Sequence, residues 1–348
     1  MEVYILVLFL CIFCFFITSI VRGVDLLVSV TLIFALLLVS GFRYKVGTDF
    51  NTYLYFIELI RDGHDTYMEP GFELMVRFLT SSGFEEQSIF LISSLLTLTF
   101  FYLFIIKHSK QYTLSVVIFY LFPIFYLASF NGVRQFIAVS IFLYSIRFIL
   151  ANNFISYFTL IVAASFIHKT VLLMLPVYFL LNIKINNKRA VIISVLYIGL
   201  INFLPFVGRA LGFPEKYFSD ALVTDGNNFK ALIFPLIFAF YCFIEKRYQG
   251  KCKDENVTYN MLLIGSLISI TPLMSSLPSA PVIRMSSYFT PIVIVLLANA
   301  PFVFKSLSVK LFYYTGVVIV SILYFSSTVL IGGEKFNLVP YSFNFQIL

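Results

Sequence analysis

Apolar runs of roughly 15 to 20 residues follow one another along almost the whole chain, each close to the length that an α-helix needs to cross a bilayer. Short polar segments that hold most of the Lys and Arg residues separate these runs. When lipid is the solvent, backbone N–H and C=O groups must be satisfied within each segment, so the pattern predicts a helical bundle. A mean hydropathy of +0.95, with only 12% charged residues, excludes a pair of ordinary water-soluble domains.

We therefore predict an all-α, polytopic transmembrane bundle of about 12 passes, within a range of 10–14, that forms a single integral membrane domain over residues 1–348. The first run lacks a basic leader and a cleavage site, so we expect a retained span. The expected spans are 4–21, 26–41, 88–106, 113–130, 134–150, 154–167, 169–182, 190–207, 230–245, 258–275, 285–303 and 311–332. The segment 154–182 forms two short spans, one broken helix or a re-entrant pair.

The distribution of charge predicts the orientation, since Lys and Arg accumulate in short cytoplasmic loops. The loops assigned to the cytoplasm are 22–25, 107–112, 146–153, 183–189, 245–257 and 304–310. They hold thirteen Lys and Arg residues against four Asp and Glu, which leaves eleven against thirteen for the outside. We expect both termini outside, with a long external loop at 42–87 and a second at 208–229. The basic residues form no single aromatic-rich face, so no nucleic-acid partner is expected.

The sequence lacks the usual patterns of cofactor and metal sites. Its three histidines are far apart, and it has no P-loop or dinucleotide fingerprint. Cys11 and Cys14 form a C-x-x-C pattern without a second pair of ligands, and we expect them, Cys242 and Cys252 to be unbridged. We therefore expect no cofactor and no metal site.

The external loop 42–87 is expected to contain two short amphipathic helices. Apolar residues recur at helical spacing between Phe50 and Ile60, which predicts a helix over 50–61 with one apolar face on the membrane or on the bundle. Glu69-Pro70-Gly71-Phe72 predicts a turn into the second helix, because proline suits the first helical turn.

Four polar groups stand at the predicted outer ends of apolar segments. They are Arg43 with Asp49, Arg134 with Gln135, His168 with Lys169, and Arg284. Ionisable groups at membrane depth are costly and usually face a wet cavity or a partner. Because the charge rule places all four on one side, we predict one shared external cavity.

Each group has a functional and a purely structural interpretation. The turn 43–50 could present backbone N–H groups and a guanidinium to a phosphate, or hold only an Arg43–Asp49 surface pair. Arg134 begins a span, where helix N-terminal amides favour an anion, although a snorkelling arginine fits as well. Arg284 is either a cation of the cavity or a helix-end anchor. His168 is either a general base or a structural histidine.

Taken together, these residues resemble the Wzy-type repeat-unit polymerases of O-antigen and capsule synthesis, in particular the EpsG-like branch. The matching pieces are Arg43 to Phe50 with Tyr53, Glu69 to Phe72, Asn131 to Ala138, His168-Lys169-Thr170 with Pro176, and Arg284 with Tyr288-Phe289. They occur in family order between residues 40 and 290. Each piece is short, and their joint order and spacing carry the resemblance.

The resemblance implies a glycosyltransferase of the bacterial inner membrane whose active site faces the periplasm or exterior. Its donor and acceptor would both be oligosaccharides linked to undecaprenyl diphosphate, with a flippase and a chain-length regulator as candidate protein partners. An acceptor hydroxyl would attack the anomeric carbon and displace the lipid diphosphate, without a metal ion.

The candidate site residues fall into three groups. His168 is the candidate base, with Asp49 or Glu69 as substitutes. The candidates for binding the diphosphate are Arg43, Lys45, Arg134, Gln135, Lys169 and Arg284. The candidates for binding sugar are Tyr53, Asn131 and Tyr288.

Other membrane proteins would also need a cationic cavity. A flippase or transporter for lipid-linked oligosaccharides would expose it to both sides in turn. An O-antigen ligase would use the same donor with another acceptor, but its motifs usually lie in a late external loop. A multipass acyltransferase would prefer a cytosolic donor site, and a scaffold would need none of these charges.

Overall fold

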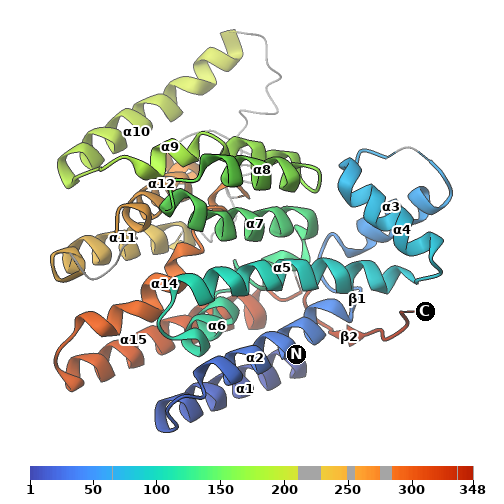
Figure 1. Cartoon of the computed structure of the whole chain (residues 1–348), viewed down its shortest axis with the longest axis horizontal. Coiled ribbons are helices and arrows are strands. Elements are labelled where there is room, and N and C mark those ends of the chain that lie inside the picture. The colour runs from blue at the N-terminus through green and yellow to red at the C-terminus, as the bar shows by residue number, and fades with distance from the viewer. Residues whose placement is uncertain (65, 211–228, 249–254, 275–283, 335, 348) are drawn as a thin grey trace. The chain divides into compact units, whose positions relative to one another are not determined.

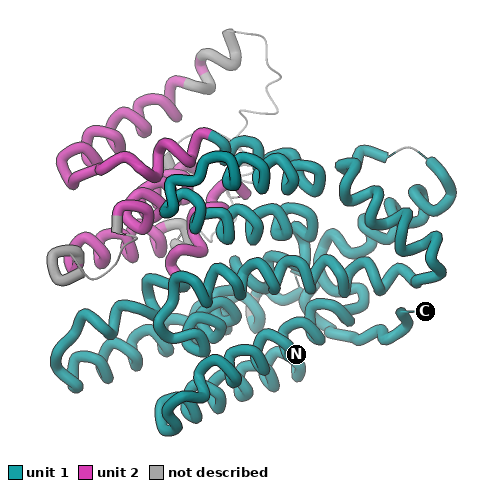
Figure 2. The backbone as a smooth tube through the Cα atoms, viewed as in Figure 1, with its two compact units in different colours: residues 1–175, 294–348 teal, residues 176–293 magenta. Residues whose placement is uncertain are grey.

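The computed structural model describes residues 1–348 apart from 65, 211–228, 249–254, 275–283, 335 and 348. The described residues form helices almost throughout, with one short antiparallel strand pair (Figure 1). They divide into two compact units (Figure 2). Unit 1 comprises Met1–Leu175 and Ile294–Leu348, and unit 2 comprises Pro176–Val293. The expectation of a single membrane domain stays a prediction.

Most of the described helices and both strands belong to unit 1. Unit 1 contains α1 (Glu2–Ile20), α2 (Asp25–Gly41), β1 (Arg43–Tyr44), α3 (Phe50–Arg61), α4 (Pro70–Ser81), α5 (Glu86–His108), α6 (Tyr112–Leu121), η1 (Leu127–Phe130), α7 (Val133–Leu150), α8 (Phe154–Ser165), η2 (Lys169–Met174), η5 (Ala300–Val303), α15 (Leu307–Ser326), η6 (Ser327–Ile331) and β2 (Ser342–Phe343). Unit 2 contains α9 (Val177–Asn182), α10 (Asn187–Ala210), α11 (Phe229–Tyr248) and α12 (Glu255–Met274). Helix α14 (Ile292–Asn299) continues from unit 2 into unit 1.

The helices confirm the predicted all-α class and its many apolar segments. Among the described residues, four helices are long and apolar enough to cross a membrane: Glu2–Ile20, Glu86–His108, Val133–Leu150 and Leu307–Leu330. Shorter apolar helices overlap most of the other expected spans. The number of passes stays a prediction, and most of the expected external loop 208–229 lies outside the described residues.

The expected span 113–130 is wrong as one continuous helix. Helix α6 ends at Leu121, and η1 begins only at Leu127. Pro123 explains the break, because proline lacks a backbone N–H and disfavours a helical conformation at Phe122 before it. The intervening turn brings the chain to the start of α7.

The segment 154–175 forms a hairpin rather than one broken helix. The hydroxyl of Tyr157 in α8 donates to the carbonyl of Met174 in η2 at 2.5 Å. A continuous helix would place residues this far apart in sequence roughly 25 Å apart at 1.5 Å per residue. The contact therefore shows that η2 turns back along α8, with His168 at the turn.

The two short helices of the loop 42–87 confirm the predicted amphipathic pair. Helix α3 has the predicted bounds, and α4 begins at Pro70. Their apolar faces pack on each other and on the start of α5, so α3 lies on the bundle. The buried cluster comprises Phe50, Tyr53, Ile57, Ile60, Met68, Phe72, Val76, Leu79, Ile89, Phe90 and Val133.

The two ends of unit 1 differ in the loops that they bring together. Helices α3 and α4 and the β1–β2 pair lie at one end (Figure 1). At the other end, the Asp25 carboxylate accepts the N–H groups of Tyr112 and Thr113, and Asn299 bonds to the backbone of His108 and Lys110. These contacts join two of the loops that the charge rule assigned to the cytoplasm, 22–25 and 107–112, and Asn299 lies just before a third, 304–310.

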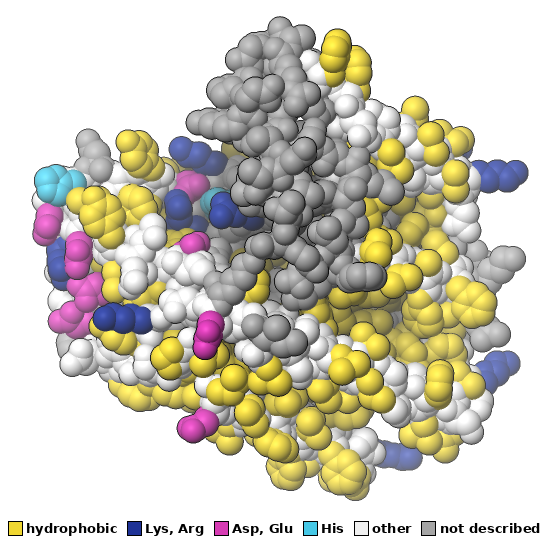
Figure 3. Space-filling view, turned by 180° about the vertical axis from the view of Figure 1, so that it is seen from behind, with side chains coloured by type: hydrophobic (Ala, Val, Ile, Leu, Met, Phe, Trp, Pro, Cys, Tyr) yellow, Lys and Arg dark blue, Asp and Glu magenta, His cyan; other side chains and the backbone are white. Residues whose placement is uncertain are grey.

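Charged and apolar side chains occupy different parts of the surface. The end of the molecule formed by α3 and α4 carries acidic, basic and histidine side chains together (Figure 3). Hydrophobic side chains cover much of the rest of this face (Figure 3). Such an apolar surface is expected of helices that face lipid.

Candidate active site

Three segments of unit 1 meet around the carboxylate of Glu69. Glu69 directly precedes α4, Arg134 lies in the first turn of α7, and His168 and Lys169 form the turn between α8 and η2. We call these four residues the Glu69 cluster. The structure thus brings together residues from three distant motifs, each of which the sequence marked independently as a candidate.

The Glu69 carboxylate is buried and makes contacts on both oxygens. One oxygen, Oε2, pairs with Nη1 of Arg134. The other, Oε1, accepts the backbone N–H of Lys169 at 3.1 Å and lies 3.3 Å from Nδ1 of His168. Only 6% of the residue is exposed. A carboxylate with this many charge-assisted contacts is held firmly in one position.

These contacts determine the ionisation of Glu69. Burial raises the pKa of the carboxyl group, but contacts with His168, the Lys169 N–H and the Arg134 charge outweigh it. The pKa falls from 4.5 to about 2. Glu69 is therefore an anion at neutral pH and a poor proton acceptor.

A glycine permits the close approach of α4 to the α8–η2 turn. The N–H of Gly71 donates to the carbonyl of Phe166 at 2.8 Å. A Cβ atom at position 71 would lie 2.8 Å from that carbonyl oxygen, closer than real contacts allow. The absence of a side chain at Gly71 thus lets Glu69 reach His168 and Lys169.

Aromatic rings hold the Arg134 side chain beside Glu69. Its guanidinium lies 6.0 Å from the ring centroid of Tyr53 and 5.9 Å from that of Phe72. The Tyr53 hydroxyl also accepts the backbone N–H of Arg134 at 3.4 Å. The side chains of Arg134 and His168 remain 22% and 21% exposed, so both can reach a ligand from solvent.

The turn 45–49 lies against the loop that leads into α7. The N–H of Thr48 donates to Oδ1 of Asn131 at 2.7 Å, and the N–H of Gly47 donates to the carbonyl of Asn337 at 2.8 Å. Both amides therefore have partners within the protein, so neither is open to a phosphate in this structure. Lys45 is exposed on this turn, and Asp49 is half-buried at the start of α3.

Arg43 is buried, contrary to its expected place among the exposed cations. Its side chain is 2% exposed, and its guanidinium donates to the carbonyls of Ser40 and Phe130. It also lies over the rings of Phe90 and Phe130. Burial lowers the pKa of Arg43 to about 10, so it stays charged at neutral pH. Direct contact with a diphosphate does not fit this position, and neither does the alternative of a surface pair with Asp49.

The other candidate residues are either buried in unit 1 or belong to unit 2. Gln135 is buried in α7, and Tyr53 is covered by Phe72 and Phe90. Arg284 and Tyr288 belong to unit 2, where Arg284 is exposed and Tyr288 is fully buried.

One residue that contacts the turn 45–49 is not predictable from the sequence. Asn337 is far away along the chain, and a single asparagine outside any periodic pattern gives no signal. Its positive φ of 50° is typical of the left-handed conformation that asparagine tolerates, but this becomes visible only in the structure.

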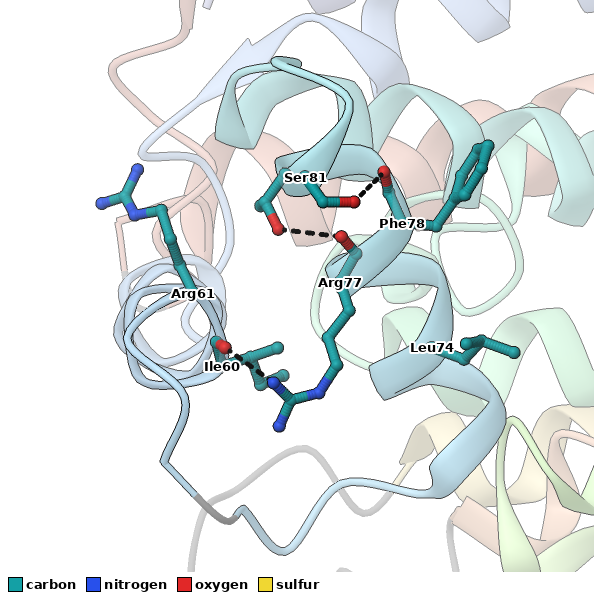
Figure 4. Close-up of a pocket in the computed structure, with 7 residues that line it drawn as sticks. Ile60, Arg61, Leu74, Arg77, Phe78 and Ser81 are labelled. Carbon is teal, nitrogen blue, oxygen red and sulfur yellow. Dashed lines mark hydrogen bonds between the residues drawn. The ribbon is translucent and has the colours of Figure 1, made fainter.

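A shallow cavity of about 570 Å³ lies between α3 and α4 (Figure 4). Arg77 reaches across it to the carbonyl of Ile60 and pairs with Glu73, while Arg61 pairs with Glu86. Both guanidinium groups are thus already neutralised, and we assign no ligand to the cavity. Its lining residues are Ile60, Arg61, Leu74, Arg77, Phe78, Thr80 and Ser81.

No group of three or more His, Cys, Asp or Glu residues that could hold a metal ion occurs in the described part of the chain. Cys11 and Cys14 are free thiols, and Cys252 lies outside the described residues.

Comparison with known proteins gives one result for the whole chain. No curated protein and no solved structure matches it. The EpsG family matches residues 26–343, which include every motif of the resemblance and all members of the Glu69 cluster. The chain therefore belongs to the EpsG family and is a membrane protein of the Wzy polysaccharide-polymerase type.

Proposed function

We propose that the protein joins oligosaccharide repeat units that are linked to a polyprenyl diphosphate, with undecaprenyl diphosphate as the carrier. The observation that carries this proposal is the Glu69 cluster, which places an imidazole and a guanidinium on one carboxylate at the end of unit 1 formed by α3 and α4. Family membership supports the same class of reaction.

The reaction is a single displacement. A hydroxyl of the acceptor repeat unit attacks the anomeric carbon of the reducing-end sugar on the growing chain. The bond from that carbon to the diphosphate oxygen breaks, and the lipid diphosphate leaves with the bonding electrons. The hydroxyl proton passes to the base. One displacement inverts the anomeric centre, and diphosphate is a good enough leaving group for cationic side chains to replace a metal ion.

His168 is the proposed base, and Glu69 orients it. With its proton on Nδ1 facing Glu69, the imidazole has Nε2 as its proton acceptor. The same carboxylate stabilises the imidazolium that forms when the acceptor hydroxyl is deprotonated, as in carboxylate–histidine pairs of other transferases and hydrolases. Asp49 remains a substitute base, whereas the low pKa of Glu69 removes it from that role.

Arg134 and Lys169 are the proposed ligands of the leaving diphosphate. Arg134 uses Nη1 for Glu69, and a guanidinium carries five N–H donors in all, so it can bind a second anion. Lys169 binds the same carboxylate through its backbone N–H, and the residue is exposed. Lys45 is a further exposed cation of unit 1, and Arg284 is an exposed cation of unit 2 that we propose as a ligand from its own motif. Gln135 and the buried Arg43 support the segments of unit 1 around them.

Asn131 is the proposed sugar contact, whereas Tyr288 is fully buried in unit 2 and presents no exposed face to a sugar. The Oδ1 atom of Asn131 is taken by Thr48, so its Nδ2 hydrogens are the donors left for a sugar hydroxyl. Tyr53 is better placed to support Arg134 than to stack on a sugar, because neighbouring rings cover it.

The proposed setting is the bacterial inner membrane, with the Glu69 cluster facing the periplasm or exterior. The charge distribution of the loops supports this orientation. A flippase would supply the substrate from inside, and a chain-length regulator is a further proposed partner.

The decisive experiment uses purified protein and a synthetic repeat unit on a polyprenyl diphosphate. We expect longer lipid-linked products, with equal yield in the presence of a chelator. Absence of elongation by folded protein would contradict the proposal, and loss of products with chelator would contradict the metal-free reaction alone.

The phenotype of a deletion strain distinguishes a polymerase from a flippase and from a ligase. A strain that lacks polymerase activity still displays single repeat units outside, whereas a strain that lacks a flippase retains them inside. A ligase defect would instead leave polymer on its carrier lipid. We expect the first phenotype from a deletion of this gene.

A further inference from the structure

The C-terminal segment of unit 1 lies across the turn 45–49. We call residues 336–347 the C-terminal strap. Strand β2 of the strap pairs antiparallel with β1, with Arg43 opposite Phe343 and Tyr44 opposite Ser342. The strap ends at the start of α5, where the N–H of Glu85 donates to the carbonyl of Ile347 at 2.9 Å. It thus joins both ends of the external loop 42–87.

Asn337 makes the contacts of the strap with the turn itself. Its side-chain Nδ2 donates to the carbonyl of Lys45 at 3.1 Å and to that of Gly47 at 3.3 Å. Its own carbonyl accepts the N–H of Gly47 at 2.8 Å. One residue therefore satisfies three backbone groups of a turn that has no regular structure of its own.

The turn needs such support because its backbone is in an unfavourable conformation. Lys45 has a φ of 55° and Gly47 a φ of 98°. A lysine rarely adopts the left-handed region, and it stays there only when surrounding contacts hold it. At Gly47, a Cβ atom would lie 2.7 Å from Oδ1 of Asn131, so the turn also fits closely against the loop before α7.

The contact continues from the turn to the Glu69 cluster. Thr48 follows Gly47 and binds Asn131, which lies three residues before Arg134. A shift of the turn would therefore move Lys45 directly and Asn131 through Thr48. Both residues are proposed ligands of the substrate.

We propose that Asn337 is a positioning residue for substrate binding, because it fixes the turn 45–49 that carries Lys45 and holds Asn131. This inference rests on the proposed function, since the ligand concerned is the lipid diphosphate with its first sugar. Asn337 acts through other residues and touches no reacting atom.

The test variant is Asn337→Asp. Aspartate has the same size and tolerates a positive φ, but it replaces the two N–H donors by an oxygen that faces the carbonyls of Lys45 and Gly47. The matched control is Asn344→Asp in the same strap, whose side chain accepts the N–H of Gln346. Asn337→Gly is a second variant that keeps the backbone conformation and removes the side chain.

Two measurements on the full chain in detergent test the inference. Hydrogen–deuterium exchange over residues 43–50 reports the turn, and calorimetric titration with farnesyl diphosphate reports binding of a lipid diphosphate. We expect faster exchange and an affinity roughly tenfold weaker in both Asn337 variants, which corresponds to losing about one good polar contact. The Asn344 control should behave as wild type.

Steady-state kinetics of the Asn337 variants distinguish a positioning role from a general loss of activity. With the lipid-linked repeat unit, the Asn337 variants should show a higher KM, a kcat within about twofold of wild type, and an unchanged pH profile, as expected when ground-state and transition-state binding weaken together. The inference would be overturned if the Asn337 variants exchanged faster over residues 43–50 but bound farnesyl diphosphate as tightly as wild type. Exchange as slow as in wild type, or a fall in kcat with an unchanged KM, would overturn it as well. If wild-type protein binds farnesyl diphosphate but makes no polymer, the proposed function fails. The calorimetric titration of the Asn337 variants still tests the role of Asn337 in that case.

Discussion

The Nδ1 atom of His168 lies 3.3 Å from Oε1 of Glu69, and the same oxygen accepts the N–H of Lys169, the next residue. One carboxylate thus fixes both the imidazole and the backbone beside it. Its second oxygen holds Arg134. Glu69 therefore links the proposed base to a proposed diphosphate ligand, which is a stronger structural role than that of a substitute base.

Replacing Glu69 by glutamine should lower kcat more than it alters KM. The amide has nearly the same shape but cannot stabilise an imidazolium, so we expect kcat to fall by about 10²-fold or more. Glu73→Gln is the matched control, because Glu73 in α4 pairs with Arg77 and accepts the hydroxyl of Thr66, and neither residue belongs to the Glu69 cluster. Wild-type kcat in Glu69→Gln would contradict the orienting role.

Replacing His168 by alanine should remove the base and leave the diphosphate site in place. We expect kcat to fall by about 10²- to 10⁴-fold, the usual contribution of general base catalysis. Affinity for farnesyl diphosphate should change little. Added imidazole should restore part of the activity, because the side chain is partly open to solvent. Full activity of the variant would shift the assignment to Asp49.

Arg134→Ala and Arg284→Ala should each abolish polymer in cells while the protein remains folded in detergent. Removing a group that stabilises developing charge costs about 10²- to 10³-fold in kcat. Lysine at either position retains the charge and should retain part of the activity. A normal polysaccharide ladder from both alanine variants would contradict the assigned roles, and normal activity of Arg284→Ala alone would contradict the role of Arg284.

Alanine substitution should lower the stability of the protein at Arg43 and weaken substrate binding at Lys45. Arg43→Ala leaves the buried carbonyls of Ser40 and Phe130 without their donor, at about 1–3 kcal/mol each, so we expect a melting temperature several degrees lower. Lys45→Ala removes an exposed side chain, so stability should not change while KM rises. Thermal unfolding and kinetics of the two variants check both statements. A stable Arg43→Ala protein with a raised KM would restore Arg43 as a direct ligand.

Local patterns predicted much of this architecture correctly. The apolar spacing of 50–61 gave the bounds of α3, and Pro70 marked the start of α4. The charge rule placed Arg134 and His168 at the same end because it depends only on which loops hold the cations.

Partner choice within the cluster was not predictable from such patterns. Eight acidic residues occur in the loop 42–87, and nothing in their spacing selects Glu69 as the partner of His168. The close approach of Gly71 to Phe166 brings Glu69 to His168, and this tertiary contact leaves no pattern in the sequence. Arg43 is buried for a similar reason, since Phe90 and Phe130 come from segments far from it in sequence.

The low pKa of Glu69 predicts a specific dependence of stability on pH. A carboxyl group whose pKa is lower in the folded protein than in the unfolded chain stabilises the fold above its unfolded pKa of about 4.5. That stabilisation is lost as the pH falls from about 4.5 through the folded value of about 2. Wild-type protein should therefore lose stability in this window beyond the loss seen in Glu69→Gln, which has no group to protonate there.

The measurement is the melting temperature of both proteins in detergent at several pH values between 7 and 3. Other carboxyl groups contribute equally to the two proteins, so the difference between them isolates Glu69. We expect a smaller difference at pH 3 than at pH 5, because Glu69 of the unfolded chain binds a proton in this window while Glu69 of the folded protein stays mostly ionised. A difference that stays constant to pH 3 would show that the carboxylate is not held by Arg134, His168 and Lys169 in the manner described, and the proposed orientation of His168 would then lose its basis.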